Sequence, residues 1–385
     1  MLLVDEHRQY LADGARVSAF RQAIEDVVRP GDVVLDLASG TGILGLLACR
    51  AGAGRVYSVE VSGMIELARE ICRANGFQDR MVFLKGLSTR VDLPEKVDVA
   101  VCDQMGRFGF EAGVVQFFAD ASKRFLKPGG TLIPARLDMV VCPVECQEIW
   151  SQVEYWNDSP AGFDFRPARQ WAANTGYPVK LVPDQLLASP AVLTTLEMTS
   201  APTSFRREVT LVVSRRGVLH GIGGWFSAQL SRNVTMTNSP LVAERINRHN
   251  VFFPLDRPVP VVAGDCIRIQ MHIAVPDIMV TWNVEVRGQA KDQSPAEANG
   301  CKARFSHSTL RGMLLSKEDL RKTQPQFTPK LSSWGLARRS ILELCDGKRP
   351  LVEIEQEVFR RHGDLFPSLG EAAGFVAEVV TRYSV

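Results

Sequence analysis

The sequence predicts an α/β fold in three parts: a Rossmann-like parallel-sheet domain (residues 1–134), an antiparallel β-barrel domain (135–315) and a small helical domain (316–385). Strands and helices alternate along the first part, which favours right-handed crossovers and a parallel sheet. Short β-rich runs between Gly and Pro turns fill the second part. Helical periodicity returns after a polar, proline-containing segment near Leu315. A chain of 385 residues is also longer than a single hydrophobic core usually supports.

In the first domain, an apolar run ends in a glycine-rich turn and is followed by a helical pattern. The expected strands cover 33–38, 56–59, 81–84 and 97–102. One helix is expected from residue 43, a second over 64–75 and a third over 113–125. The motif LKPGG (126–130) is expected to form a turn into a further strand, TLIP.

The β-rich runs of the second domain include VTLVVS from Val209, GGWFSAQL from Gly223 and CIRIQMHIAV from Cys266. Their alternation and turn residues predict antiparallel strands. In the third domain, Asp346 and Gly347 are expected to form a turn between two helices. Leu351, Ile354, Val358 and a helix near 375–383 would then close a small core.

Composition excludes several classes of function. Lys and Arg number 45 against 43 for Asp and Glu, so the chain lacks the charge excess of a nucleic-acid-binding protein. No apolar stretch has the length of a membrane span, and the charged start MLLVDEHRQY does not resemble a signal peptide, so we expect a cytoplasmic protein. The 8 cysteines lack zinc-site spacing, so no metal is expected and the thiols should be reduced.

The glycine turn predicts a nucleotide cofactor. Gly40, Gly42 and Gly45 satisfy the pattern GxGxxG, which dinucleotide-binding dehydrogenases also show. Asp36 before the turn suits a loop that wraps an amino acid and a ribose, and Glu60 can accept hydrogen bonds from both ribose hydroxyls. Together with LKPGG, these acids favour S-adenosylmethionine as the cofactor.

From Leu2 to about Leu315 the chain resembles the protein arginine methyltransferase family. The resemblance rests on LVDEHRQYLADGARVSAFRQAI, VVLDLASGTGILGLLACRAGAGRVYSVEVS, VDLPEKVDVAV, DQMG, RFLKPGGTLIPARLDM and NVFFPLDRPVPVVAGDCI. It implies that Arg8 binds the cofactor carboxylate, that the turn from Gly40 to Gly42 holds the methionine part, and that Glu60 binds the ribose. Ser88, in the segment GLSTR, is counted with the cofactor-binding residues. The resemblance also implies a homodimer formed through an arm at 150–174.

The substrate side departs from that family, which holds a guanidinium between two glutamates on a hairpin. Here the segment CDQMGRFGFE supplies Asp103 and Glu111, one residue closer together, with Arg107 between them. The Thr-His-Trp triplet of the family is absent near 245–247. A shorter, differently spaced acid pair should change the substrate or abolish activity. We expect Asp103 and Glu111 to orient an amine, which has a pKa of about 10 and must lose a proton before it attacks.

The third domain indicates a peptide substrate. SILELCDGKRPLVEIEQEVFRRHG from Ser340 resembles the helical part of PqqD-like domains, which recognise precursors of ribosomally synthesised and post-translationally modified peptides. The strands that usually precede it are short or missing, and a helical cap or a dimer contact is the alternative interpretation. His249 and His362 are left unassigned.

The sequence therefore predicts an S-adenosylmethionine-dependent N-methyltransferase that acts on an amine of a precursor peptide, as in daptide-type pathways. Two alternatives stay open. One is a protein arginine N-methyltransferase with shifted acids, and the other is a catalytically weakened scaffold that binds a peptide.

Overall fold

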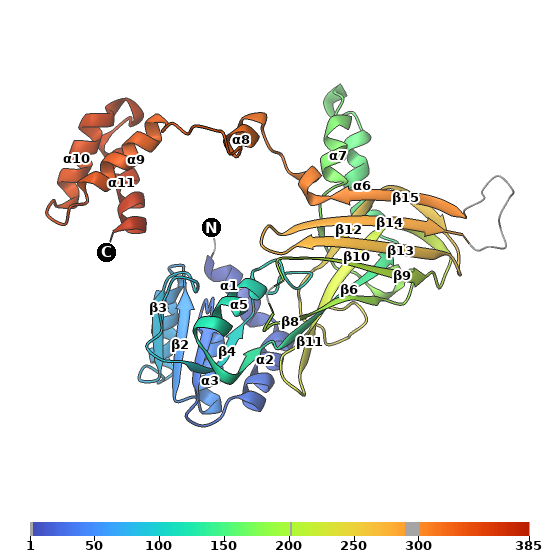
Figure 1. Cartoon of the computed structure of the whole chain (residues 1–385), viewed down its shortest axis with the longest axis horizontal. Coiled ribbons are helices and arrows are strands. Elements are labelled where there is room, and N and C mark those ends of the chain that lie inside the picture. Colours follow the sequence, from blue (N-terminus) through green and yellow to red (C-terminus); the bar gives the residue numbers. More distant parts are fainter. Residues whose placement is uncertain (1–2, 201, 289–299, 385) are drawn as a thin grey trace. The chain divides into compact units, whose positions relative to one another are not determined.

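The computed structural model describes residues 3–200, 202–288 and 300–384 (Figure 1). They form two compact units, and the boundary between them in the sequence lies between Met313 and Leu314. Each unit has a hydrophobic core of its own.

The first unit begins with a five-stranded parallel sheet in the order β3-β2-β1-β4-β5. Its strands are β1 (Val33–Leu37), β2 (Arg55–Glu60), β3 (Met81–Lys85), β4 (Val97–Cys102) and β5 (Leu126–Ile133). Its helices are α1 (Leu3–Ala12), α2 (Gly14–Val27), α3 (Ile43–Ala51), α4 (Met64–Ala74) and α5 (Val114–Arg124). The central strand β1 is almost entirely buried, as expected of a strand covered on both faces. The predicted Rossmann-like sheet is confirmed.

LKPGG does not form a separate turn, contrary to the prediction, but lies inside β5. Val97 of β4 pairs with Leu126 and Val99 pairs with Thr131, so the register shifts between the two pairs. The extra residues of β5 between these two pairs form a β-bulge. The bulge accommodates Pro128 and also Gly129, whose φ of +78° lies in the left-handed region. Pairing with β4 therefore outweighs the local turn preference.

Two antiparallel sheets complete the first unit, with strand orders β7-β12-β10-β6-β8, β11 pairing with β10, and β15-β14-β13-β9. The strands are β6 (Arg136–Val144), β7 (Tyr177–Val179), β8 (Ala191–Glu197), β9 (Ser204–Val212), β10 (Gly217–Gln229), β11 (Thr235–Thr237), β12 (Asn250–Val261), β13 (Cys266–Ala274), β14 (Met279–Arg287) and β15 (Cys301–Ser308). Short helices η4 (Pro183–Gln185) and η6 (Thr309–Gly312) lie between or after them. The predicted antiparallel domain is confirmed.

A helical arm is inserted between β6 and β7. It comprises α6 (Gln147–Glu154), η1 (Tyr155–Asn157), η2 (Pro160–Gly162), η3 (Arg166–Ala168) and α7 (Arg169–Ala172). Tyr155, Phe163 and Phe165 on this arm are exposed. Exposed aromatic side chains are enriched at protein interfaces, and the role of this arm as a dimer contact stays a prediction.

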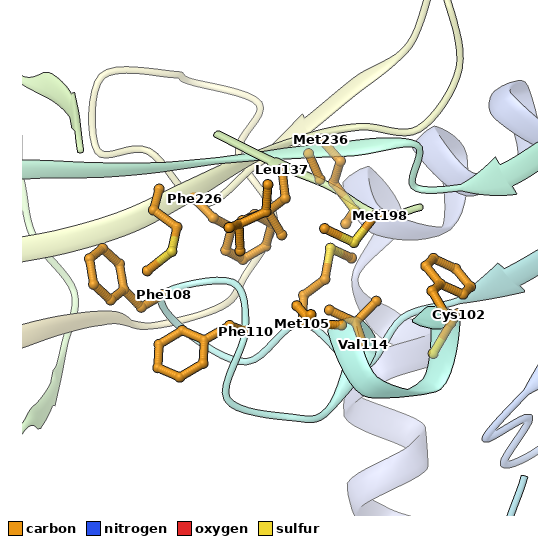
Figure 2. Packing of buried hydrophobic residues seen from close by; sticks show 14 of the residues in the cluster. Cys102, Met105, Phe108, Phe110, Val114, Leu137, Met198, Phe226 and Met236 are labelled. Carbon is orange, nitrogen blue, oxygen red and sulfur yellow. The ribbon is translucent and has the colours of Figure 1, made fainter. Parts of the chain in front are cut away.

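A loop between β4 and α5 joins the parallel sheet to the antiparallel sheets. Met105, Phe108 and Phe110 of this loop are almost completely buried, and Figure 2 shows them among Leu137 and Phe226 of the antiparallel sheet. The same loop carries Asp103 and Glu111. Its apolar side chains therefore fix the position of the two acids.

The second unit contains helices but no strand among its described residues. Its helices are α8 (Lys317–Lys322), α9 (Ser333–Leu344), α10 (Leu351–His362), η7 (Gly363–Leu365) and α11 (Leu369–Tyr383). Ile341, Ile354, Val358 and Val376 are buried in its core. Ser332 and Ser368 cap α9 and α11 by accepting hydrogen bonds from Gly335 and Glu371.

Helices within the described ranges are all too short or too polar to cross a membrane. The cysteines are free thiols, and most of them are buried, as predicted.

Candidate functional site

The glycine turn follows the carboxyl end of β1 and has a left-handed backbone. Gly40 has φ +52° and Gly42 has φ +78°, a region that favours glycine. The N–H of Gly42 donates to the carbonyl of Ser39 at 2.8 Å, which closes the turn before α3 begins. Gly40 also lies directly beneath α1, because a Cβ atom there would stand 2.5 Å from Cε1 of His7.

Two buried acids accept hydrogen bonds from the backbone of this turn and of the residues beside it. Asp36 is fully buried, and its Oδ2 accepts the N–H of Gly45 at 2.9 Å. Burial raises the pKa of Asp36 to about 7, with a further contribution from the charge of Glu60. Glu60, at the end of β2, accepts the N–H groups of Gly40 at 3.0 Å and Ser62 at 2.8 Å. Both carboxylates therefore stabilise the backbone around the turn.

A cavity of about 710 Å³ opens beside the turn within the first unit. Its walls are α1, the start of α2, the glycine turn, the loop after β4 and segments of the antiparallel sheets. The polar residues of the lining include His7, Asp13, Arg16, Ser39, Asp103, Arg107, Glu111, Lys180, Asn247, Arg248 and His249. A cavity of this size is typical of a small-molecule site.

Arg16 of α2 is a buried cation in the lining of this cavity. Its Nε donates to Asp103, and its Nη1 donates to the carbonyl of Tyr10 at 3.1 Å. The guanidinium also lies over the rings of Tyr10 and Phe20, at 5.6 and 5.8 Å from their centroids. Asp13 caps α2 by accepting the backbone N–H of Arg16 at 3.2 Å.

Arg8, which the family resemblance favours for the cofactor carboxylate, does not line this cavity. Its side chain is 66% exposed and pairs with Asp5 at 2.7 Å. Arg16 lies on the stripe of α2 that also buries Phe20 and Ile24. That stripe, with apolar residues four and eight positions after Arg16, is the sequence signal that identifies it as a buried arginine.

Asp103 is already paired with two arginines. Besides Arg16, Nη2 of Arg248 lies 3.4 Å from both of its carboxylate oxygens. The side chains of Asp103 and Arg248 are only 7% and 16% exposed. A carboxylate between two guanidinium groups has little capacity left to hold a third.

Glu111 lies at the other end of the same loop. Its carboxylate accepts the backbone N–H of Phe108 at 2.9 and 3.1 Å and that of Phe110 at 3.1 Å. Burial raises its pKa above the usual range, although these hydrogen bonds oppose the shift. Glu111 therefore holds a proton more readily than an exposed glutamate does.

The structure brings three of the predicted site residues into the cavity lining: Gly40, Asp103 and Glu111. Asp36, Gly42 and Glu60 lie around the turn instead, as its supports. Ser88 is outside the lining, and its backbone carbonyl accepts a hydrogen bond from Nη2 of Arg124 at 2.6 Å. Sequence reasoning missed Arg16 and Arg248, and the sequence near Arg248 contains no signal that marks it as a partner of Asp103.

The residues around the turn fit a cofactor that has both polar and charged groups. Oγ of Ser39 and Oδ1 of Asp36 are buried and have no hydrogen-bond partner among the described residues. Buried polar atoms are normally satisfied, and Ser39 lines the cavity, so its unpartnered hydroxyl indicates a ligand or water there. Arg16 adds a cation at the same place. Within the described ranges no group of three His, Cys, Asp or Glu side chains could hold a metal ion.

Comparison with known proteins identifies relatives of the first unit. Residues 20–137 match the family model described as ribosomal protein L11 methyltransferase, and residues 135–285 match the arginine methyltransferase oligomerization subdomain. Neither match extends into the second unit.

Among curated proteins, the chain is 30% identical over 233 residues to protein arginine N-methyltransferase 1 of Dictyostelium discoideum. This match covers 59% of this chain and 68% of that protein. It is 28% identical to protein arginine N-methyltransferase 1 of Chlamydomonas reinhardtii, over 64% of this chain and 74% of that protein. Among solved structures, the Trypanosoma brucei PRMT1 enzyme–prozyme complex with AdoHcy has the same fold, with a TM-score of 0.70, 22% identity and coverage of 78% and 96% of the two chains.

Proposed function

This chain belongs to the protein arginine N-methyltransferase family, and from that premise we propose that it methylates an amine nitrogen of a peptide. Membership of the family confirms two predictions from the sequence, namely that the chain is a methyltransferase and that S-adenosylmethionine is its methyl donor.

On the cofactor side, we assign the carboxylate of the methionine part to Arg16 and its backbone cradle to the turn at Gly40. Arg16 is the buried cation in the lining, whereas Arg8 is exposed. Glu60 keeps its proposed role toward the ribose, because its carboxylate is held by two backbone N–H groups and retains free lone pairs. S-adenosylmethionine supplies a methyl group that its sulfonium has already activated.

On the acceptor side, the observation that carries the proposal is the double pairing of Asp103 with Arg16 and Arg248. A guanidinium requires two well-placed carboxylates, and here neither Asp103 nor Glu111 is unoccupied. An amine needs only one acceptor for its proton. Glu111 lines the cavity, and burial raises its pKa above that of an ordinary glutamate, which makes it the better candidate for the base.

Arginine methylation is the second candidate function. The relatives named above are protein arginine N-methyltransferases. The sequence resemblance also puts Asp103 and Glu111 in the segment that corresponds to the glutamate hairpin of that family. For this function, Arg248 would have to leave Asp103 when the substrate binds.

We further propose that the second unit binds the leader segment of a precursor peptide. Support comes from its resemblance to the helical part of PqqD-like domains and from its three packed helices α9, α10 and α11. Because its described residues contain no strand, recognition would use the helix surfaces. Trp334, Leu336 and Leu342 of α9 are apolar side chains that are exposed there.

The test is a methylation assay on matched peptides. Each peptide carries one acceptor only, either a free α-amine, a lysine or an arginine, and mass spectrometry locates the added methyl group. We expect methylation of an amine peptide, and we expect Glu111→Gln to lower kcat by about 100-fold through loss of the base while S-adenosylhomocysteine still binds. Methylation of the arginine peptide alone would support the second candidate. No methylation despite cofactor binding would indicate a scaffold.

A further inference from the structure

The acids of the cavity are already satisfied by the chain itself. Asp13 accepts the backbone N–H groups of Arg16 at 3.2 Å and Asn247 at 2.8 Å. Asp103 is paired with two arginines, and Glu111 accepts backbone hydrogen bonds. Asp13 and Asp103 therefore have little capacity left for a cationic group of a substrate, and Glu111 remains as the acceptor for the proton of the amine.

Two cations of the same cavity form no ion pair with another described residue, although the charge of Arg107 does act on the nearby Glu111. The guanidinium of Arg107 has no hydrogen-bond or ion-pair partner in the part of the chain that the structure describes. Among the described residues, Nζ of Lys180 donates only to Oδ1 of Asn247, a neutral amide, at 3.0 Å. These side chains are exposed, so they are available to a ligand in the cavity.

The fold holds these cations close together beside His249. One side-chain amide, Nδ2 of the buried Asn238, donates to the carbonyls of both Arg107 and His249 at 2.9 Å. Val179 of β7 pairs with Asn250 of β12 in an antiparallel ladder, so Lys180 and His249 follow at the end of the same ladder. The pKa of His249 is lowered by burial and also by the charges of Lys180 and Arg107.

We propose that Arg107, Lys180 and His249 form an anion subsite that binds a side-chain carboxylate of the peptide substrate next to its acceptor amine. This inference rests on the proposed function, because it specifies which peptides enter the acceptor side of the cavity. A carboxylate can accept hydrogen bonds from Arg107 and Lys180 together, and hydrogen bonds between charged groups are the stronger kind. A lysine or arginine side chain at that position would meet like charge.

The test uses the full-length protein loaded with S-adenosylhomocysteine. Three peptides of equal length share one free N-terminal amine and differ only at their second and third residues, which are Glu-Glu, Gln-Gln or Lys-Lys. Calorimetry at low salt should rank their affinities in that order. We expect a step of about threefold to tenfold for each cation involved, since exposed charge pairs are weakened by solvent and salt. High salt should reduce the difference.

Substitutions then locate the subsite. Arg107→Gln and Lys180→Gln should each reduce the preference for Glu-Glu over Gln-Gln. The matched controls are Arg21→Gln on α2 and Lys123→Gln on α5, which remove the same charges from exposed positions outside the cavity and should keep the preference. Equal affinities, tightest binding of the Lys-Lys peptide or no binding of any peptide would overturn the subsite. If the Glu-Glu preference holds but no peptide is methylated, the proposed function fails and the subsite stands.

Discussion

At the scale of single residues, the negative charge of Asp103 stabilises the fold, because it pairs with two largely buried arginines. Replacing Asp103 by Asn leaves Arg16 and Arg248 buried without a counter-charge. Removal of one partner from a buried ion pair typically costs about 3 to 5 kcal/mol, so Asp103→Asn should lower the free energy of unfolding by that order. Affinity for S-adenosylhomocysteine should also change, because Asp103 positions Arg16. Urea denaturation and calorimetry measure the two effects.

The matched control for this substitution is Asp92→Asn. Asp92 also pairs with an arginine, Arg124 at 3.6 Å, but its side chain is 98% exposed. Exposed pairs contribute about 0 to 1 kcal/mol, so this variant should keep its stability. An equal loss in both variants would contradict a buried charge cluster at Asp103.

Asp36 should make stability depend on pH. Its pKa is about 7 in the folded chain, against 3.8 for an ordinary aspartate, so the folded state retains a proton that the unfolded state has lost. The stabilisation is therefore complete below pH 4 and is lost as the pH rises through 7. Between pH 5 and 8 the wild type should lose roughly 3 kcal/mol more than Asp36→Asn.

Urea denaturation of both proteins across this pH range isolates the contribution of Asp36, because other titrating groups cancel in the difference. Asn can still accept the N–H of Gly45 through its amide oxygen, as Asp36 does through Oδ2. Parallel curves for the two proteins would mean that Asp36 is charged in the folded chain.

Residue types predicted the site only in part. Gly40, Asp103 and Glu111 line the cavity because a turn after β1 and a loop after β4 of a parallel sheet must open at the same edge. Arg16 could have been found from the buried stripe of α2. Arg248 could not, because its contact with Asp103 joins residues 145 positions apart and depends on how the antiparallel sheets pack.

At the scale of elements, α1 covers the glycine turn, and the ring of His7 fills the place that a side chain at position 40 would take. Gly40→Ala would place a Cβ 2.5 Å from Cε1 of His7, at a φ of +52° that alanine rarely adopts. We expect this variant to displace the His7 ring, to strain the turn and to weaken S-adenosylhomocysteine binding by about 10-fold or more, since both lie in the cavity wall. Calorimetry with S-adenosylhomocysteine measures the loss.

Gly14→Ala at the start of α2 is the control, because nothing lies within 4 Å of its Cβ position. Alanine is compatible with a helix, so this variant should bind the cofactor normally and gain a few tenths of a kcal/mol or more in stability. If Gly40→Ala also binds normally, α1 is not needed to close the cavity.

Element boundaries in the first domain were predicted to within a few residues, because its apolar runs are buried on both faces of a parallel sheet. LKPGG was predicted wrongly, since its Pro and Gly are local turn signals while its pairing partner, β4, lies far away in the sequence. In the tail, α11 begins at Leu369, six residues before the predicted helix at Phe375. Ser368 caps it there, and this capping serine is visible in the sequence.

At the scale of the whole molecule, the two units separate the proposed tasks. Every residue that lines the large cavity lies between His7 and Thr309, inside the first unit. The second unit has its own core, built from α9, α10 and α11. This separation is compatible with the proposal that the first unit performs catalysis and the second unit binds the leader segment.

A chain truncated after Met313 tests this division. It should keep its affinity for S-adenosylhomocysteine, because it retains the cavity and the cores of the first unit. Its KM for a full-length precursor peptide should rise by about 10-fold or more, since a tethered leader raises the effective concentration of the acceptor. For a leaderless peptide, both forms should have the same KM, which serves as the internal control. Equal KM values of the two forms for the full-length precursor would exclude the second unit as the leader receptor. A loss of cofactor affinity on truncation would instead make the second unit a structural support of the first.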